Sequence, residues 1–345
     1  MKQIRLCYLH STCKNIQDFL ESVRITFAPS NVELIWDEEN PEILFATDMI
    51  WYHPAIFKKF KHLYPKAIIT VYYCSEALSV DFNMFDLAVT YDGSFHGQRY
   101  AQMLPPEIFF ERFLRDSENT ILNIKEAQEE LKSKTGFCNF IYSNPKANPY
   151  RDQLFHKISE YKKVDSLGRH LNNTGKGGTG YRGHEKEGID LKCPYKFSIA
   201  CENSFFHGYT TEKLLTSLQA HTVPIYWGNP DVELDINPEC YINCMKYKTM
   251  DEVLLRVKEI DEDDELWCKI VSQPWHFEKQ KKEKERRIQE YYAFFDRLFS
   301  SDFQTLRYRG DGTISQGYRN FFFRHRYVTD YKAAIQRKIK KIINK

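Results

Sequence analysis

The stretch YKFSIACENSFFHGYTTEKLLTSLQAHTVPIYWG, residues 195–228, contains two short apolar runs separated by a polar loop and a helical pattern. The runs YKFSIAC and VPIYWG are rich in aromatic and β-branched residues, which is typical of buried strands. Between them, TTEKLLTSLQA has the apolar spacing of an amphipathic helix. The order strand, helix, strand predicts a parallel βαβ unit.

The same alternation extends over most of the chain. Short apolar runs and helix-like segments alternate in residues 1–132, and the pattern resumes in residues 133–300. We therefore expect an α/β protein with two doubly wound, Rossmann-like domains, 1–132 and 133–300, facing one another across a cleft. A polar helical segment that ends in Gly136 marks the expected boundary. Residues 301–345 are expected to form a C-terminal segment with a helical tail.

Composition excludes several classes of protein. With 345 residues, 42% of them hydrophobic, the chain can fill two ordinary cores. A formal charge of +2 argues against a general nucleic-acid binder. The chain has nine cysteines and no CxxC pair, a pattern that favours buried free thiols over disulfides. Cys240 and Cys244 lack a second ligand pair, so buried thiols are also favoured over a zinc site there. The start of the chain lacks a signal-peptide core, and no apolar run is long enough to cross a bilayer.

Ligands of open α/β sheets bind where strands end and helices begin. The loop SNPKANPYR, residues 143–151, follows one such strand and contains Ser143, Asn144 and Arg151. Arginine is disfavoured in the first turn of a helix unless an anion lies beside it. A solvated surface arginine is the alternative.

The loop CENSFFHGYTTEK, residues 201–213, follows the next strand of this kind. It offers Asn203, an aromatic ring at Tyr209, and Glu212 beside Lys213 at the start of a helix. A carboxylate and an ammonium suit the ribose and phosphates of a nucleotide diphosphate. Glu212 is equally compatible with ordinary helix capping. We expect Glu202 to orient this loop.

Three further motifs contain charged or glycine-rich residues. Glu76 follows the apolar run AIITVYY and is the best-placed general base, although a surface-loop role is the alternative. GKGGTGYRG, residues 175–183, lacks the spacing and setting of a phosphate loop and is interpreted as a loop between strands. EIDEDDE, residues 259–265, lacks the spaced ligands of a calcium loop and is interpreted as a solvated acidic turn.

Together, these motifs resemble the bacterial α1,3-fucosyltransferases of glycosyltransferase family 10. The resemblance rests on residues 71–92, SNPKANPYR, GYTTEK after the pair Glu202 and Asn203, and HTVPIYWGNPDV, residues 221–232. It implies a GT-B fold with an N-terminal acceptor-side domain and a C-terminal domain for GDP-fucose. It also implies Glu76 as the catalytic base.

The resemblance further implies which residues bind the donor. They are Arg151, Asn203, Tyr209, Glu212 and Lys213, with Ser143, Asn144 and Arg169 as additional candidates. The implied reaction is an inverting transfer of L-fucose from GDP-β-L-fucose to a GlcNAc or Glc hydroxyl of a Galβ1,4GlcNAc-type acceptor, for Lewis-type lipopolysaccharide glycans. No cofactor and no metal ligands are expected, and a divalent metal would at most stimulate.

The tail, residues 331–345, carries six basic residues, no acid, and isoleucines on one helical face. This pattern favours peripheral contact with an anionic inner membrane, and a helix packed on the protein is the alternative. We therefore expect a cytoplasmic protein on the inner face of the membrane, without nucleic-acid partners. The rival functions are another GT-B nucleotide-sugar transferase and a non-catalytic, membrane-associated nucleotide-sugar-binding protein.

Overall fold

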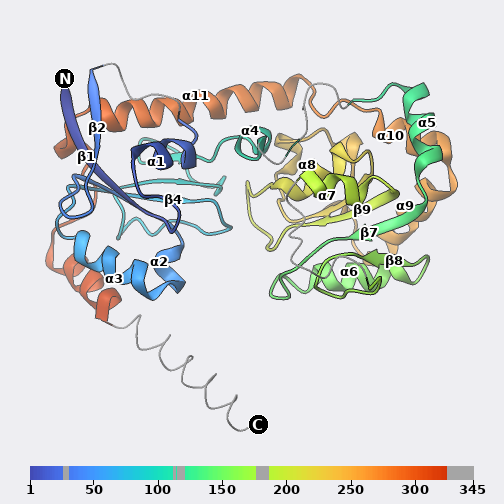
Figure 1. Ribbon diagram of the computed structural model, residues 1–345, viewed down its shortest axis with the longest axis horizontal. Coiled ribbons are helices and arrows are strands. Elements are labelled where there is room, and N and C mark those ends of the chain that lie inside the picture. The colour runs from blue at the N-terminus through green and yellow to red at the C-terminus, as the bar shows by residue number, and fades with distance from the viewer. Residues whose placement is uncertain (26–30, 112–113, 115–120, 176–185, 325–345) are drawn as a thin grey trace, which may run out of the picture. The chain divides into compact units, whose positions relative to one another are not determined.

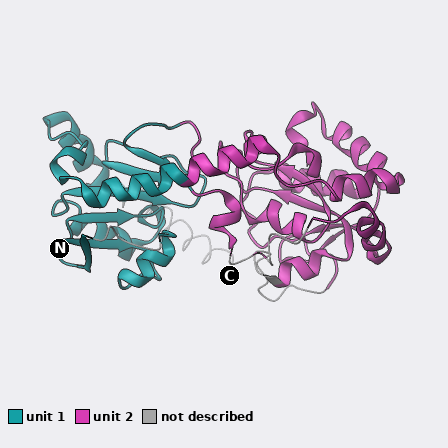
Figure 2. Cartoon of the chain, turned by 90° about the horizontal axis from the view of Figure 1, so that it is seen from above, with its two compact units in different colours: residues 1–91, 95–103, 289–345 teal, residues 92–94, 104–288 magenta. Residues whose placement is uncertain are grey.

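A computed structural model describes residues 1–25, 31–111, 114, 121–175 and 186–324 (Figure 1). The chain forms two compact units, coloured separately in Figure 2. Unit 1 comprises residues 1–91, 95–103 and 289–345, and unit 2 comprises residues 92–94 and 104–288. The basic tail and most of the Gly-rich loop, two features singled out in the sequence, lie outside the described residues.

Unit 1 is built around a parallel sheet of six strands in the order β2-β1-β3-β4-β5-β6. Its strands are β1 (Lys2–Leu9), β2 (Val32–Trp36), β3 (Ile43–Ala46), β4 (Ile69–Cys74), β5 (Leu87–Thr90) and β6 (Tyr100–Gln102). Its helices are α1 (Ile16–Ser22), α2 (Met49–Tyr52), α3 (Pro54–Leu63), α12 (Phe303–Leu306), a helical stretch over residues 313–324, and the C-terminal part of α11 (Glu278–Ser300).

Helices cover both faces of this sheet (Figure 1). On one face, α2 and α3 bury Ile50 and Phe60 against alternate residues of β1, β3 and β4, and Phe323 of the stretch 313–324 packs beside them. On the other face, the phenol of Tyr291 in α11 is hydrogen-bonded to that of Tyr73 in β4, at 3.0 Å. Burial on both faces explains why β3, β4 and β5 are continuous apolar runs.

Unit 2 has a parallel five-stranded sheet in the order β11-β10-β9-β7-β8. Its strands are β7 (Gly136–Phe140), β8 (Val164–Ser166), β9 (Tyr195–Cys201), β10 (Val223–Trp227) and β11 (Ile242–Asn243). Its helices are α4 (Pro106–Phe109), α5 (Ile124–Ser133), α6 (Tyr150–Ser159), α7 (Lys186–Lys192), α8 (Glu212–Gln219), α9 (Met250–Glu262), α10 (Asp264–Val271) and the start of α11, with short 3-10 turns at Val232–Leu234, Pro238–Cys240 and Cys244–Lys246.

The two faces of the unit 2 sheet differ in polarity. The apolar core lies under α6, α9 and α10, where Phe140, Phe197 and Trp267 are fully buried. The opposite face carries Ser198, whose hydroxyl accepts a hydrogen bond from Ser217 of α8 at 3.1 Å. A helix with small polar residues can approach the strands closely there, and the loop 202–211 connects the end of β9 to the N-terminus of α8.

The units divide the chain elsewhere than at the expected boundaries, residues 132 and 300. Residues 104–132 belong to unit 2, because Ala127 of α5 is buried in its apolar core. The described residues from Gln289 onward belong to unit 1, and the aromatic residues of α11 from Tyr291 onward pack on the first sheet. The helix α11 passes from one unit to the other without interruption.

All nine cysteines lie in the described part of the chain and are free thiols. Cys240 and Cys244 are both buried, as the sequence predicted. No helix within the described ranges combines the length and apolar character needed to cross a membrane.

Candidate functional site

The strand order of unit 2 reverses direction at β7. The chain leaves β7 for β8 on one side and later returns to β9 on the other side, so the loops after β7 and β9 diverge at the carboxyl edge of the sheet. Ligands of doubly wound sheets bind at this kind of switch point. The two loops are directly joined, because the N–H of Asn148 donates to the carbonyl oxygen of Asn203 at 2.9 Å.

Arg151 lies in the first turn of α6 and is 1% exposed, so the alternative of a solvated surface arginine is wrong. Its guanidinium packs 4.3 Å from the ring of Tyr142, and its Nη2 donates to the carbonyl oxygen of Asn144 at 2.5 Å. Nη1 has no hydrogen-bond partner among the described residues, and Nε has only Asp152 Oδ1 nearby, at 3.6 Å. A buried arginine with unused donors is prepared to accept an anion.

Tyr142 fixes the position of Arg151 relative to β9. Its phenol accepts a hydrogen bond from the N–H of Cys201 at 2.7 Å and lies 2.9 Å from the carbonyl oxygen of Ile199. The carboxylate of Asp152 also contacts His170 Nε2, at 2.8 Å. Arg151 is therefore held by residues from both sides of the switch point.

A buried carboxylate shapes the second loop. Glu202, fully buried, accepts hydrogen bonds from the N–H of Thr211 at 2.8 Å and from its hydroxyl at 2.7 Å. Lys213 Nζ lies 3.2 Å from Glu202, 3.2 Å from Glu212 and 2.9 Å from the hydroxyl of Thr211. The expected orienting role of Glu202 matches these contacts.

The charges of this cluster depend on one another. Burial disfavours the charged forms of all three groups. Burial raises the pKa of Glu202, with Lys213 acting against it, whereas Lys213 outweighs burial at Glu212 and lowers the pKa of that carboxyl group. The pKa of Lys213 is raised, because the two carboxylates outweigh burial. The lysine is therefore a persistent cation at the N-terminus of α8, a position that the helix dipole alone would disfavour.

Gly228 makes the position of Glu202 possible. It has φ +150°, and a Cβ atom at this residue would lie 2.5 Å from both Cβ and Cγ of Glu202. The residue after β10 must therefore be glycine for the buried carboxylate to pack against the backbone there.

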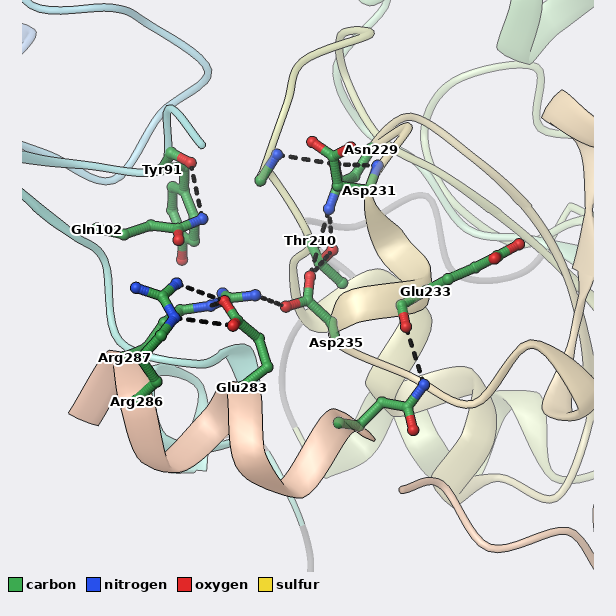
Figure 3. A network of polar contacts seen from close by, with 12 residues as sticks. Tyr91, Gln102, Thr210, Asn229, Asp231, Glu233, Asp235, Glu283, Arg286 and Arg287 are labelled. Carbon is green, nitrogen blue, oxygen red and sulfur yellow. Dashed lines mark hydrogen bonds and ion pairs between the residues drawn. The ribbon is translucent and has the colours of Figure 1, made fainter. Parts of the chain in front are cut away.

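A second buried carboxylate holds the neighbouring residue of the loop (Figure 3). The hydroxyl of Thr210 donates to Asp235 Oδ2 at 2.5 Å, and Asn229 Nδ2 donates to that hydroxyl at 2.9 Å. Asp235 is ion-paired with Arg287, which also contacts Glu283 at 3.2 Å. Thr210 and Thr211 are thus held by different carboxylates, and the loop is fixed on both sides before α8 begins.

The remaining candidates in unit 2 differ in accessibility. Tyr209 is 3% exposed, so little of its ring is open for the expected packing on a nucleotide. Ser143 is partly buried, and Asn144 and Arg169 are exposed, on loops after β7 and β8. Phe205 is 51% exposed, its ring 6.0 Å from that of Trp227.

Glu76 lies in unit 1, two residues after the end of β4, and is exposed. Its carbonyl oxygen accepts a hydrogen bond from the N–H of Leu78 at 2.8 Å, which closes a tight turn at the carboxyl edge of the sheet. The strand-end position predicted from the sequence is confirmed. Across the described ranges, no three His, Cys, Asp or Glu side chains are grouped so as to hold a metal ion.

Comparisons with known proteins show which family the part of the chain that carries these loops is similar to. Residues 131–298 match the model of glycosyltransferase family 10 (fucosyltransferase), C-terminal. This part of the chain is therefore similar to the C-terminal domain of family 10 fucosyltransferases. The matched range contains the Arg151 loop, Thr210 and Thr211, and the buried carboxylates of Glu202 and Asp235.

Relatives of the family 10 domain include curated fucosyltransferases. A fucosyltransferase of Acanthamoeba polyphaga mimivirus is 35% identical over 151 residues, which is 42% of this chain and 24% of that protein. The α-(1,3)-fucosyltransferase FucT of Helicobacter pylori is 29% identical over 217 residues, which is 54% of this chain and 43% of that protein. The chain therefore spans less than half the length of these curated relatives.

A solved α1,3-fucosyltransferase with GDP-fucose superposes with a TM-score of 0.61 and 22% identity, over 88% of this chain and 92% of that one. This similarity shows the fold. The α/β architecture is that of the GT-B fucosyltransferases, as expected from the sequence.

Sequence reasoning missed the supports beneath the family 10 loop. Tyr142, Asn229, Asp235 and Arg287 were not singled out, because each looks like an ordinary strand-end or helix residue in the sequence. Tyr142 and Asn229 each follow a strand end, and Asn229 lies within the motif of residues 221–232, so position carried a local signal for these two residues.

Proposed function

We propose that this protein is an inverting α1,3-fucosyltransferase. It moves L-fucose from GDP-β-L-fucose to a GlcNAc or Glc hydroxyl of a Galβ1,4GlcNAc-type acceptor, and Lewis-type glycans of lipopolysaccharide are the expected products. The observation that carries the proposal is the pair of hydrogen-bonded loops at the switch point, which presents a buried Arg151 with unused donors inside a family 10 domain.

Arg151 is proposed as the principal contact of the donor diphosphate. Its guanidinium is held in place by Tyr142 and Asn144, so little side-chain entropy is lost when it binds an oxygen of the phosphate. The charge that develops on the departing diphosphate would be stabilised by this preorganised cation and by the N-terminus of α6.

Lys213 and Glu212 are proposed to exchange partners when the donor binds. The three contacts of the ammonium group use all of its donors, so a phosphate oxygen must displace one of them. Glu212 is the more accessible of the two carboxylates, because its side chain is 15% exposed whereas that of Glu202 is fully buried. Displacing Glu212 from Lys213 would free its carboxylate for the ribose hydroxyls, while Asn203 would contact fucose or phosphate.

Glu76 is proposed as the catalytic base that takes the proton from the attacking acceptor hydroxyl. Inversion needs one displacement through an oxocarbenium-like transition state, so a single base suffices. A positioned base contributes roughly a hundred- to ten-thousand-fold in rate. No step of this scheme uses a metal or cofactor.

The donor assignment is tested by GDP binding to Arg151→Gln. We expect affinity to fall roughly ten- to a hundredfold, which corresponds to one charge-assisted hydrogen bond. Arg256→Gln is the matched control, since Arg256 is ion-paired with Glu259 on α9. Unchanged affinity in Arg151→Gln would contradict the assignment.

The rival functions give different outcomes in the same assay. Another GT-B nucleotide-sugar transferase would bind GDP-mannose or a UDP-sugar more tightly than GDP-fucose. A non-catalytic binding protein would bind GDP-fucose but would neither transfer nor hydrolyse it. A panel of lactose, N-acetyllactosamine and lacto-N-biose then identifies acceptor and linkage.

We also propose a cytoplasmic location on the inner face of the membrane, with residues 331–345 as the contact. The six basic residues and the isoleucine face of this segment support the proposal. Flotation with anionic vesicles should be lost when the basic residues of this segment are replaced by glutamine. Undiminished flotation of that variant would contradict it.

A further inference from the structure

A basic pocket lies in unit 1, and none of the residues assigned a role above lines it. Its volume is about 410 Å³, within the range of small-molecule sites. Five basic side chains and one acidic side chain line it. They are Lys61, Arg307, Arg309, Arg319 and Arg324, with Asp311.

Two of the arginines are buried and have unused donors. Arg309 is 7% exposed and Arg319 is 8% exposed, and the Nη1 atom of each lacks a hydrogen-bond partner among the described residues. Orphaned buried donors are rare in folded proteins, because each costs free energy unless a ligand or ordered water satisfies it. Two of them lining one cavity indicate a ligand that accepts several hydrogen bonds.

The acidic groups nearby are already paired. Asp311 contacts Arg307 through both carboxylate oxygens, at 3.0 and 3.1 Å. Asp86, beneath the pocket, lies 3.6 Å from Arg309 Nε and accepts the backbone N–H of the same residue. No described carboxylate lies within ion-pair distance of Arg319, so the pocket retains excess positive charge.

Backbone and aromatic groups contact these arginines and the ring beside them. Arg309 Nη2 donates to the carbonyl oxygen of Ala67 at 2.5 Å, and its guanidinium lies 4.7 Å from the ring of Tyr64. Phe323, one helical turn after Arg319, packs 5.2 Å from the same ring. Burial raises the pKa of Tyr64, and Arg309 and Arg319 act against this shift, as expected for two cations close to the phenol.

We propose that this pocket binds a phosphate group, presented by a soluble phosphate ester or by a phospholipid headgroup. Arginine forks match phosphate oxygens in pairs, and an apolar floor of aromatic rings strengthens such contacts. The pocket lies at the amino edge of the unit 1 sheet, since Ala67 precedes β4 whereas Glu76 follows it. The two edges are about 20 Å apart for a strand of this length, so the pocket is a separate site from the proposed base.

The test uses the full-length protein and inorganic phosphate as the probe. Hydrogen exchange of residues 305–324 should slow when millimolar phosphate is added. In Arg319→Gln, the phosphate concentration that gives half of the maximal protection should rise roughly ten- to a hundredfold. Arg324 lines the same pocket at an exposed position, so Arg324→Gln should weaken phosphate binding less than Arg319→Gln does. Because an exposed side chain can be replaced without disturbing the fold, this second variant tests the pocket even if Arg319→Gln folds poorly.

Arg151→Gln should leave the protection unchanged, which separates this site from the proposed donor site. Vesicles of phosphatidylcholine with and without phosphatidylglycerol then identify the source of phosphate. Weaker flotation of Arg319→Gln than of the unaltered protein indicates a lipid headgroup, and equal flotation indicates a soluble ester. Phosphate that fails to protect residues 305–324 in the unaltered protein, or equal protection in Arg319→Gln, would overturn the proposal.

Discussion

Replacing Glu202 by glutamine removes the negative charge that organises the loop before α8. The carboxylate accepts two hydrogen bonds from Thr211 and lies 3.2 Å from Lys213. Each hydrogen bond to a charged acceptor contributes about 1 kcal/mol more than one to a neutral acceptor, so about 2 kcal/mol is lost at Thr211. Lys213 keeps Glu212 as a partner, and the neutral side chain escapes the burial cost that raises the pKa of Glu202, so the total stays below the roughly 3 to 5 kcal/mol for a broken buried pair.

We therefore expect Glu202→Gln to lower the free energy of unfolding by about 1 to 2 kcal/mol. Amide hydrogens of residues 203–211 should exchange faster than in the unaltered protein, since the N–H of Thr211 loses its charged acceptor. GDP affinity should fall with the population of the ordered loop. Urea denaturation, hydrogen exchange and calorimetric titration measure the three effects on the same sample.

Glu129→Gln is the matched control, because the Glu129 side chain is 73% exposed and, among the described residues, its ion pair is with the exposed Lys132. It should change the free energy of unfolding by no more than about 0.5 kcal/mol. If Glu202→Gln were as stable as this control, with unchanged exchange of residues 203–211, the loop would be held by something other than the buried carboxylate.

Three other changes follow from the same contacts. Gly228→Ala should destabilise the protein by about 2 kcal/mol or more in urea denaturation, since the new methyl group would clash with Glu202. Arg287→Met leaves Asp235 buried and uncompensated, and should cost about 3 to 5 kcal/mol by the same measurement. Burial lowers the pKa of Lys192 to about 7, so the unfolded chain binds an extra proton between about pH 7 and 10. Thermal stability from this group should fall as pH falls through that window, and Lys192→Met should remove the dependence.

Each of these changes has a control in a less constrained place. Gly312→Ala meets no atom within 4 Å and should be close to neutral. Arg256→Met removes a partly exposed pair and should cost less than about 1 kcal/mol. Lys282→Met, at an exposed position of α11, should leave the pH profile of thermal stability unchanged. Equal effects in any variant and its control would contradict the corresponding contact.

The fold could be predicted from local patterns, because both sheets are parallel and buried on both faces. Such strands are continuous apolar runs, and runs such as AIITVYY and YKFSIAC became β4 and β9. The unit boundaries could not be predicted in this way. The helix α11 keeps its helical pattern over 23 residues while its packing partners change from one unit to the other, and local periodicity carries no information about partners.

The site was only partly predictable for a related reason. Positions at strand ends, such as Arg151 and Glu76, follow from the general geometry of parallel sheets. The buried pair of Asp235 and Arg287 joins residues 52 positions apart, and no sequence pattern connects the two. The burial of the Tyr209 side chain also depends on packing against distant parts of the chain, which the loop sequence alone does not indicate.

The central claim is that the chain transfers fucose with Glu76 as the base. The most direct measurement is the rate and anomeric configuration of transfer from GDP-fucose to N-acetyllactosamine, for the unaltered protein and for Glu76→Gln. The account predicts an α-linked fucoside from the unaltered protein and a rate at least about a hundredfold lower for Glu76→Gln, with GDP affinity unchanged. Transfer by Glu76→Gln at the rate of the unaltered protein, or a β-linked product, would contradict it.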